Sequence, residues 1–215
     1  MWQSIYKQRK PKANNYIQEN KMALTESTMM ALGSPAPSFS LPSTDGEQVT
    51  LANFEGKEGL VVMFICNHCP YVIHIAPALA KLAAEYQQKN IGFVAISSND
   101  ASTYPADSFE LMKEEKAKQG YTFAYLYDES QAVAKAYNAA CTPDIYLFDK
   151  EQKLVYRGQF DDTRPHRISS GNYDSSAAPA TGADLKAALD LLLAGQAIPT
   201  KQYPSIGCNI KWKDS

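Results

Sequence analysis

The stretch that decides the fold is residues 60–70, Leu60-Val61-Val62-Met63-Phe64-Ile65-Cys66-Asn67-His68-Cys69-Pro70. Its first six residues are apolar, which is typical of a strand buried on both faces. A helical pattern follows, and a proline fits the first turn of a helix because the amides there have no intrahelical partner. The two cysteines therefore stand at a junction between a buried strand and a helix. Thiols at this spacing can close a small reversible disulfide, so we expect redox chemistry here.

Composition excludes several other classes of function. The chain has 215 residues, of which 45% are hydrophobic, and a formal net charge of -2. A chain of this length can bury a core without disulfide bonds. The charge gives no general attraction to nucleic acid, and no apolar run approaches the roughly 18 residues of a membrane span. We expect one globular domain that binds neither nucleic acid nor membrane, in an oligomeric state that the sequence does not fix.

The first 30 residues are expected to form a basic, disordered extension. Its positive charges before Met22 outnumber the single acid Glu19 and are Lys7, Arg9, Lys10, Lys12 and Lys21. No apolar segment follows them as in a secretory signal, and four scattered cysteines do not make a secreted disulfide scaffold. We therefore expect a reducing compartment, the cytoplasm. Met22 could equally be the natural start of translation, in which case residues 1–21 are absent from the natural protein.

Periodicity predicts strands alternating with helices. The strands are expected at 39–41, 49–51, 60–65, 91–97, 123–127, 145–148 and 154–159, the first two forming a hairpin at Asp45-Gly46. The helices are expected from 72 onward with a kink at Pro77, from 107 or 108 to 118, at 130–137, and from about 181 to 195. This order indicates a parallel sheet with helices on both faces and antiparallel strands at one edge. Residues 161–182 lack periodicity and are expected to be a long loop.

Several segments together resemble the thioredoxin fold, and within it the peroxiredoxin-like branch of the AhpC/TSA (redoxin) superfamily. These are the Cys-x-x-Cys motif, Gly33–Phe39, Tyr127–Ser130, Thr142–Asp149 and Tyr156–Gly158. The resemblance covers roughly residues 30 to 195. It implies a three-layer α/β/α domain over 31–195, with a central mixed sheet and an N-terminal hairpin insertion. Residues 196–215 are then a tail, which we expect to pack on the domain because Ile206, Ile210 and Trp212 are apolar.

The resemblance also implies a substrate site. Pro143 would follow a cis peptide bond and pack against Cys66 and Cys69. The backbone of Thr142 would be the edge on which an extended disulfide substrate lies, as in strand addition.

The two cysteines are assigned different roles. Cys66 is the expected nucleophile, because the positive end of the helix favours its thiolate, and Cys69, one turn inside, is the expected resolving thiol. His68 between them can stabilise a thiolate when it is charged, or it is an ordinary surface histidine. Asn67 could be only a helix cap. In thioredoxin a buried carboxylate relays the proton of the resolving thiol, but the strand 60–65 of this chain has none. Either this chain reduces substrates more slowly than thioredoxin does, or another group relays that proton.

Two alternatives to dithiol exchange have weaker support in the sequence. A peroxidase of the superfamily requires a Pro-x-x-x-Thr/Ser-x-x-Cys motif, but Val62 and Cys66 occupy the proline and hydroxyl positions if Cys69 is the peroxidatic residue. Arg157, the only arginine in the predicted core strands, does not match the peroxidase arginine. Cys66, His68, Cys69 and a further sulfur could hold Zn or Cu(I). We nevertheless expect no metal and no organic cofactor.

Cys141 and Cys208 are possible auxiliary thiols. Cys141 precedes Pro143 by two residues, and Cys208 lies in the apolar tail. We expect Cys208 to approach Cys141 or the active site, as a second disulfide or a relay thiol. The alternative is that both are ordinary buried cysteines.

The predicted function is that of a thiol–disulfide oxidoreductase. Its partners would be disulfides or thiols of proteins or small molecules, together with an electron donor that the sequence does not identify. The direction of exchange depends on local electrostatics and is not fixed by the sequence. A peroxiredoxin-like antioxidant, or a non-catalytic metal-binding member of the fold, are the alternatives.

Overall fold

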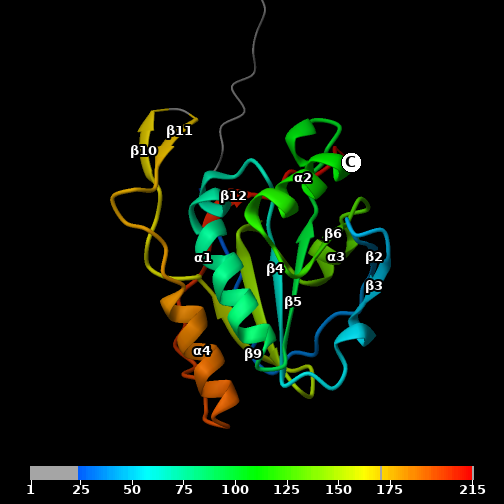
Figure 1. Cartoon of the computed structure of the whole chain (residues 1–215), viewed down its shortest axis with the longest axis vertical. Helices are drawn as coiled ribbons and strands as arrows, with labels where there is room; N and C mark the ends of the chain where they lie inside the picture. Colours follow the sequence, from blue (N-terminus) through cyan, green and yellow to red (C-terminus); the bar gives the residue numbers. More distant parts are fainter. Residues whose placement is uncertain (1–23, 170, 215) are drawn as a thin grey trace, which may run out of the picture.

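A five-stranded mixed sheet organises residues 24–169 and 171–214, which are the residues that the computed structural model describes. Its strand order is β6-β5-β4-β8-β9 (Figure 1). The parallel strands are β4 (Gly59–Phe64), β5 (Ile91–Ser97) and β6 (Ala124–Tyr127). The antiparallel strands are β8 (Asp144–Asp149) and β9 (Leu154–Gly158). All five lie at the predicted positions, with bounds within about two residues.

Two helices make the crossovers between the parallel strands. Helix α1 (Pro70–Gln87) joins β4 to β5 and continues through Pro77, and α2 (Phe109–Gln119) joins β5 to β6. Helix α2 ends at Gly120, whose φ of +69° is a left-handed conformation that glycine adopts without steric cost. Parallel strands need such crossovers because a tight turn cannot connect them.

Alternate residues of β4 pack on opposite faces of the sheet. Val61 and Met63 join a core formed with α1 and with α4 (Ala183–Leu193). Leu60 and Val62 join a second core, covered by α3 (Ala132–Ala136) and by the hairpin of β2 (Ser40–Pro42) and β3 (Gln48–Thr50). Both faces are therefore buried, which explains why β4 is apolar throughout. Short 3-10 turns follow β3 at Leu51–Phe54 (η1) and precede α2 at Pro105–Asp107 (η2).

The two ends of the described chain meet in a second sheet. Its strands are β1 (Leu24–Glu26), β12 (Ile206–Asn209) and β7 (Cys141–Thr142), in the order β1-β12-β7. The expected extension over 1–30 is thus wrong for residues 24–26, which pair with residues 206–208 of β12. Three residues are too few to show a periodic pattern, so this strand has no signal in the sequence. The rest of the expected extension, residues 1–23, lies outside the described residues.

The predicted loop over 161–182 contains a second difference. Its residues include the antiparallel strands β10 (His166–Ser169) and β11 (Asn172–Asp174). All four residues of β10 are exposed, so the strand has no buried face and no alternation of apolar residues. In Figure 1 this hairpin extends from the side of the domain that carries α4.

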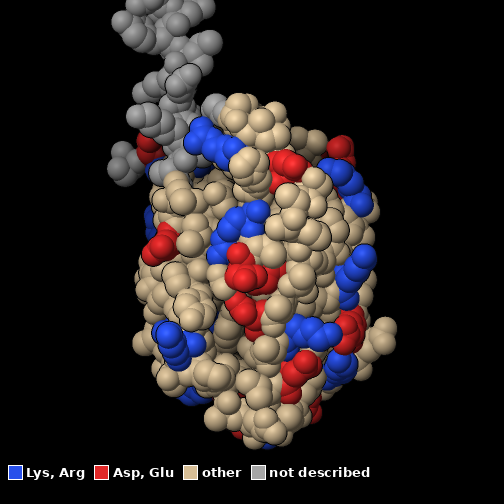
Figure 2. All heavy atoms as spheres, turned by 90° about the vertical axis from the view of Figure 1, so that its left-hand side faces the viewer, with Lys and Arg blue, Asp and Glu red and all other residues tan. Residues whose placement is uncertain are grey.

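The surface shows no dominant charge on the face seen in Figure 2. Lysine and arginine side chains lie close to aspartate and glutamate side chains there, consistent with the small net charge. No helix within the described residues is both long enough and apolar enough to cross a lipid bilayer.

Candidate active site

The pairing of β4 with β8 brings the two predicted parts of the site together. The strands are antiparallel, with Phe64 opposite Asp144, so the residues after β4 lie beside the residues before β8. Cys66 follows β4 by two residues, and Pro143 immediately precedes β8. The Thr142–Pro143 peptide bond is cis, as the resemblance implied.

Both thiols of the Cys-x-x-Cys motif contact Thr142. The Sγ of Cys66 lies 3.5 Å from the Oγ1 of Thr142, and the Sγ of Cys69 donates a hydrogen bond of 3.1 Å to the Thr142 carbonyl oxygen. The exposed fraction is 2% for Cys66 and 0% for Cys69. The structure therefore places the dithiol against the cis-proline loop, as the resemblance implied, and buries both sulfurs, which the sequence did not predict.

The position of Cys69 differs from the expectation that it lies one turn inside the helix. Helix α1 begins at Pro70, and Cys69 is its N-cap residue, with extended backbone angles. The unpaired amides of the first turn and the positive end of the helix dipole therefore lie nearest Cys69, whereas Cys66 is three residues further away. A proline fits the first position of a helix, so Pro70 could have been used to predict that α1 begins there and that Cys69 is its N-cap.

The surroundings of the two thiols change their pKa values in opposite directions. Burial raises the pKa of the Cys66 thiol well above its usual value, and Cys69 and the Asp107 carboxylate raise it further. Burial also acts to raise the pKa of Cys69, but hydrogen bonds to its sulfur from Cys208, Cys66 and Thr142 outweigh it and hold the pKa well below the usual value. In its thiol form Cys69 donates to the Thr142 carbonyl instead. The resting negative charge is thus favoured on Cys69.

A network around Asn67 fixes the loop between the two cysteines. The Asn67 amide N–H donates to Asp107 Oδ1 at 2.8 Å, and its Nδ2 donates to the Ala106 carbonyl at 2.8 Å. The Oη of Tyr125 donates to Asn67 Oδ1 at 3.1 Å. Asn67 therefore ties the loop to the segment before α2, and the suggestion that it caps α1 is wrong, since Cys69 is the N-cap.

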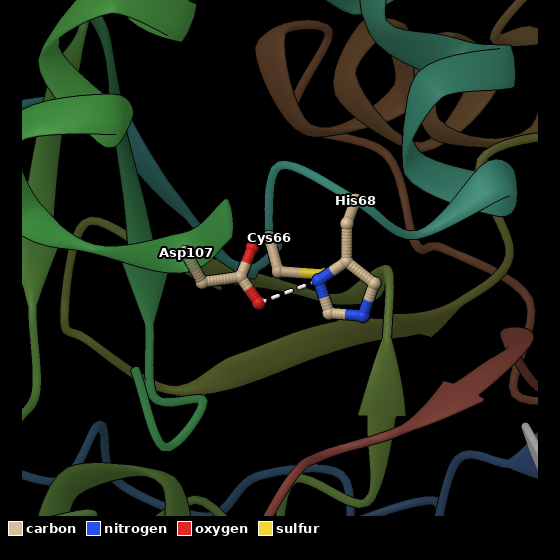
Figure 3. A group of neighbouring side chains, drawn as sticks. All are labelled: Cys66, His68 and Asp107. Atoms are coloured by element: carbon tan, nitrogen blue, oxygen red, sulfur yellow. Dashed lines mark ion pairs between the residues drawn. The ribbon is translucent and has the colours of Figure 1, made fainter. Parts of the chain in front are cut away.

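His68 is held against a buried carboxylate. Its Nδ1 lies 2.7 Å from Asp107 Oδ2, and its ring stacks on Tyr104 with the ring centres 5.6 Å apart and the planes 6° from parallel. The His68 side chain is 22% exposed and the Asp107 side chain is 0% exposed. Figure 3 shows Cys66, His68 and Asp107 pointing toward one another, the first two from the loop before α1 and the third from the segment before α2. His68 is thus part of the site and is not an unconstrained surface residue.

Asp107 is a site residue that the sequence did not reveal. The sequence pattern allowed it as a helix cap, but Ser108 is the N-cap of α2 and the Asp107 side chain faces Asn67, His68 and Asn99. It lies 40 residues from the motif in sequence, so only the three-dimensional fold brings it there.

One group of possible metal ligands lies in this site. The ligand atoms of Cys66, His68 and Asp107 are within 4.8 Å of one another, and sulfur, imidazole and carboxylate are ligands that zinc accepts. The group differs from the predicted set, which contained Cys69. However, Asp107 Oδ1 and Oδ2 already accept hydrogen bonds from Asn67 and Asn99, and Oδ2 contacts His68. The absence of a metal remains a prediction.

Cys141 and Cys208 lie on neighbouring strands but face different surroundings. In the pairing of β12 with β7, Cys208 is opposite Thr142 and Asn209 is opposite Cys141. Cys208 shares a core cluster with Cys69 and acts to lower the pKa of that thiol, whereas the Sγ of Cys141 contacts the carbonyl oxygens of Pro143 and Ser205 at 3.5 and 3.9 Å. Of the two alternatives for Cys208, the structure therefore places it at the active site.

The same pairing changes the expected substrate site. The predicted docking edge is the backbone of Thr142, but β12 of the same chain pairs with this edge. The edge is closed because the tail folds back over it as a strand, which the apolar residues of the tail do not by themselves reveal. In this arrangement a substrate does not add to Thr142 as a strand.

The comparison with protein families supports the interpretation of the dithiol site. The model of the family described as Redoxin matches residues 31–175, which is more than half of the chain. The chain belongs to the Redoxin family. Among curated proteins, the thiol-disulfide oxidoreductase ResA of Geobacillus kaustophilus is 29% identical over 136 residues, which are 62% of this chain and 74% of that protein. A putative peroxiredoxin of Mycobacterium tuberculosis is 28% identical over 123 residues, 57% of this chain and 73% of that protein.

Solved structures give a closer match over nearly the whole chain. An uncharacterised conserved protein from Geobacillus kaustophilus is 52% identical with a TM-score of 0.83, covering 90% of this chain and 98% of that one. A hypothetical protein from Sinorhizobium meliloti is 48% identical with a TM-score of 0.82, covering 89% and 100%. The thioredoxin domain of a thiol-disulfide oxidoreductase from Bacteroides vulgatus has a TM-score of 0.52 at 24% identity, covering 60% and 88%. The fold is therefore the thioredoxin fold, as predicted.

Within the Redoxin family, the arginine of this chain's core strands serves a structural role. The Nε of Arg157 donates to the Met30 carbonyl at 2.8 Å, and its Nη1 donates to Gln202 Oε1 at 2.7 Å. Both partners belong to the segments that enter and leave the domain. Arg157 thus ties these two segments to β9.

Proposed function

We propose that this Redoxin protein catalyses thiol–disulfide exchange through Cys66 and Cys69. The observation that carries the proposal is the contact of both sulfurs with Thr142, beside a cis-proline and at the start of α1. A thiolate is the nucleophile in such exchange, and this environment makes one of the two thiols acidic. The similarity to the thiol-disulfide oxidoreductase of Geobacillus kaustophilus supports the same reaction class.

Cys66 is the sulfur proposed to meet the substrate. Cys69 is enclosed by Cys66, Cys208 and Thr142, whereas Cys66 borders His68, which is partly exposed. Attack requires that Cys66 lose its proton. The Cys69 thiolate is the proton acceptor. Once it has taken this proton, the Cys69 thiol donates a hydrogen bond to the Thr142 carbonyl. This route needs no carboxylate on the strand β4, which accounts for its absence there.

The exchange then follows in two steps. The Cys66 thiolate bonds to one sulfur of the substrate disulfide, and the other substrate sulfur leaves as a thiolate that takes up the proton held by Cys69. The Cys69 thiolate next attacks the Cys66 sulfur, forms the Cys66–Cys69 bond and releases the second substrate sulfur as a thiolate, which takes up a proton from water. Two thiols of the protein are oxidised and one substrate disulfide is reduced to two thiols. An external thiol donor, whose identity is open, restores the dithiol.

The expected substrates are disulfides of proteins or small molecules. Because β12 covers the Thr142 edge, we propose that a substrate presents its disulfide beside Asn67 and His68. A disulfide in an exposed protein loop or in a small molecule fits this approach, while an extended strand that needs the Thr142 backbone does not.

Turnover assays on matched cysteine variants test the proposal. With insulin and with a small aromatic disulfide as substrates, Cys66→Ser should lose at least about 100-fold in rate, because the step without a positioned nucleophile is far slower. Cys69→Ser should accumulate a mixed disulfide on Cys66 that mass spectrometry detects. The control is Cys141→Ser, whose thiol contacts neither of these sulfurs through a hydrogen bond and whose loss should leave the rate within about twofold. Equal rates for wild type and Cys66→Ser would contradict the proposal.

The same proteins should be assayed with hydrogen peroxide and an organic hydroperoxide. We expect consumption no faster than that of an unperturbed thiol, because Val62 and Cys66 replace the residues of the peroxidase motif and Arg157 is bound elsewhere. Rapid consumption that depends on Cys66 or Cys69 would favour the peroxiredoxin alternative.

A further inference from the structure

Cys208 is held at the active site by β12, the central strand of the second sheet. Strand β12 pairs with β7 on one side and with β1 on the other, so that Cys208 lies opposite both Thr142 and Leu24. The Cys208 side chain is buried in the same hydrophobic core cluster as Cys66 and Cys69. A strand with neighbours on both sides is not a loose tail, and its position relative to the dithiol is fixed by two sets of backbone hydrogen bonds.

The close approach of β12 to the cis-proline loop depends on a glycine. A Cβ atom at Gly207 would lie 2.0 Å from the Thr142 carbonyl oxygen and 3.2 Å from Pro143 Cδ. The first separation is far below van der Waals contact, so any side chain at this position would push β12 away. Glycine permits this separation, and the next residue, Cys208, is thereby brought to Cys69.

Cys69 is the middle member of three neighbouring sulfurs. Cys66 and Cys69 both contact Thr142, Cys208 lies opposite Thr142 in the β7–β12 pairing, and all three cysteines belong to one core cluster. The pKa of Cys69 is lowered by both neighbouring thiols, which places it between them. In thiol–disulfide exchange the attacked sulfur is likewise the middle one, between the incoming and the departing sulfur. The arrangement of the three side chains thus corresponds to an exchange centred on Cys69.

We propose that Cys208 is a third redox thiol, which exchanges with the Cys66–Cys69 disulfide to form a Cys69–Cys208 disulfide. The proposal rests on the proposed function in one respect, the formation of the Cys66–Cys69 bond. Cys208 is then a catalytic residue, because its sulfur bonds directly to a reacting atom.

The step balances without any further reactant. Cys208 loses its proton and its sulfur bonds to Cys69, while the Cys66–Cys69 bond breaks and the electron pair leaves with Cys66. Cys66 then takes up a proton. One disulfide and one thiol are present before and after the step, so no electron enters or leaves the protein.

The consequence is that the oxidised protein regains its substrate-facing thiol. Cys66, which borders the partly exposed His68, is then a thiol again, while the disulfide is stored between Cys69 and Cys208. A Cys69–Cys208 disulfide would also join β12 covalently to the start of α1. The external donor would then have to reduce this inner bond or act through Cys66.

Cys141 provides a matched comparison within the same sheet. It is buried like Cys208 and lies one position away in the β7–β12 pairing. Its sulfur contacts backbone carbonyl oxygens and has no hydrogen bond to Cys69. A relay that depends on placement will require Cys208 and not Cys141.

The first test uses Cys66→Ser, which removes the substrate-facing partner and leaves the inner pair. The full-length variant is treated with the thiol oxidant diamide, the remaining thiols are blocked with a maleimide, and the peptides are mapped under non-reducing conditions. We expect one intramolecular disulfide, Cys69–Cys208, with Cys141 blocked. Cys66→Ser/Cys141→Ser should give the same bond, and Cys66→Ser/Cys208→Ser should give no intramolecular bond.

The second test uses wild-type protein and does not depend on a variant that folds correctly. Protein oxidised with one equivalent of diamide is quenched in acid, its thiols are blocked, and the modified cysteines are identified by peptide mass spectrometry. Two populations are expected, one blocked at Cys66 and the other at Cys208, with Cys141 blocked in both. If Cys208 is always blocked and Cys66 never is, the relay is overturned.

The outcomes separate this proposal from the proposed function. Normal insulin turnover with no Cys69–Cys208 bond in either test would refute the relay and leave the dithiol function intact. A Cys69–Cys208 bond in a protein that reduces no disulfide substrate would support the third redox thiol and refute the function. A slower turnover of Cys208→Ser, with Cys141→Ser unchanged, is expected if both proposals are correct.

Discussion

At the scale of single residues, Asp107 joins the parts of the active site. Its two carboxylate oxygens receive hydrogen bonds from the Asn67 backbone and from Asn99 Nδ2 at 2.8 and 2.7 Å, and one of them contacts His68. This carboxylate fixes the loop that carries both reactive cysteines. It also places a negative charge near Cys66, which is one of the causes that raise the pKa of that thiol.

The Asp107→Asn variant should therefore have two effects. Removing the negative charge should lower the pKa of Cys66, because the thiolate no longer faces a like charge. The loss of hydrogen bonds to two buried donors should also lower the free energy of unfolding by about 1–3 kcal/mol. The first effect is measured as the pH dependence of Cys66 alkylation by iodoacetamide in a Cys69→Ser background, and the second by urea denaturation.

Asp128→Asn is the matched control for this experiment. Asp128 is also fully buried, and it accepts hydrogen bonds from Ser98 and from the Ala134 backbone. Its replacement should lower stability to a similar degree but leave the alkylation profile of Cys66 unchanged. An alkylation profile that moves to higher pH in Asp107→Asn would show that the carboxylate acts mainly through a charged His68.

At the scale of elements, periodicity in the sequence predicts what packs against the core. Strand β4 is apolar because both its faces are buried, and α1 shows its buried stripe at helical spacing. The short strands β1 and β10 could not be found in this way, because one has three residues and the other is exposed along its length. They are defined by backbone pairing, which leaves no pattern in the side chains.

The residues of the candidate site likewise fall into those that a local sequence pattern marks and those that only the fold brings together. Cys66, His68, Cys69 and the Thr142–Pro143 pair were predictable because a local motif and a family resemblance mark them. Asp107 and the contact between Cys208 and Cys69 depend on segments that meet only in the folded chain. Cysteine at 208 could be suspected from the sequence, but its partner could not be chosen, since Cys141 and Cys69 are both remote from the tail in sequence.

The packing of β12 gives the prediction that belongs to this scale. Gly207→Ala would place a Cβ atom 2.0 Å from the Thr142 carbonyl oxygen, and a backbone atom cannot move aside as a flexible side chain can. We expect β12 to separate from β7, with a loss in the free energy of unfolding of about 3 kcal/mol or more. Cys69 should also lose the hydrogen bond from Cys208, which would raise its pKa.

A control at another glycine separates this clash from the general effect of adding a methyl group. Gly120 has a φ of +69°, and a Cβ atom added there would meet no other atom within 4 Å, so Gly120→Ala should cost about 1 kcal/mol from backbone strain alone. Urea denaturation and the pH dependence of Cys69 alkylation in a Cys66→Ser background provide the measurements. Two outcomes together would contradict the close approach of Gly207 to Thr142. They are an equal loss in the free energy of unfolding for both alanine variants and an unchanged pH dependence of Cys69 alkylation.

At the scale of the whole molecule, segments from both ends of the described chain complete the site. Strand β1 supports β12, and the Lys211 amide that follows β12 donates to Asn99 Oδ1 at 2.8 Å. Asn99 in turn donates to Asp107, which contacts His68. The loop that carries the two cysteines is therefore connected by hydrogen bonds to the second sheet. Conditions that disrupt the pairing of β1, β12 and β7 will also change the surroundings of the dithiol.

The free energy of unfolding should depend on pH through Asp144, the first residue of β8, which lies between the main sheet and the second sheet. Burial raises its pKa to about 6, against the opposing effect of hydrogen bonds from Ser27, Ala140 and Tyr146. In the unfolded chain an aspartate has a pKa of about 3.9. Because the folded state holds the proton more tightly, the contribution of Asp144 to stability is fully present below about pH 4 and is lost as the pH rises through about 6, a change of about 3 kcal/mol.

Asp144→Asn removes this titration and so isolates it from the other groups of the protein. The free energies of unfolding of wild type and Asp144→Asn should be measured with urea at intervals from pH 4 to pH 8. The wild-type value minus the variant value should fall by about 2 kcal/mol between pH 4 and pH 7 and stay level above pH 7. The amide's altered hydrogen bonds with Ala140 and Tyr146 change the size of the difference but not its slope, because they do not titrate in this range. A difference that is constant across pH, or that rises, would mean that burial does not raise the pKa of Asp144 at the start of β8.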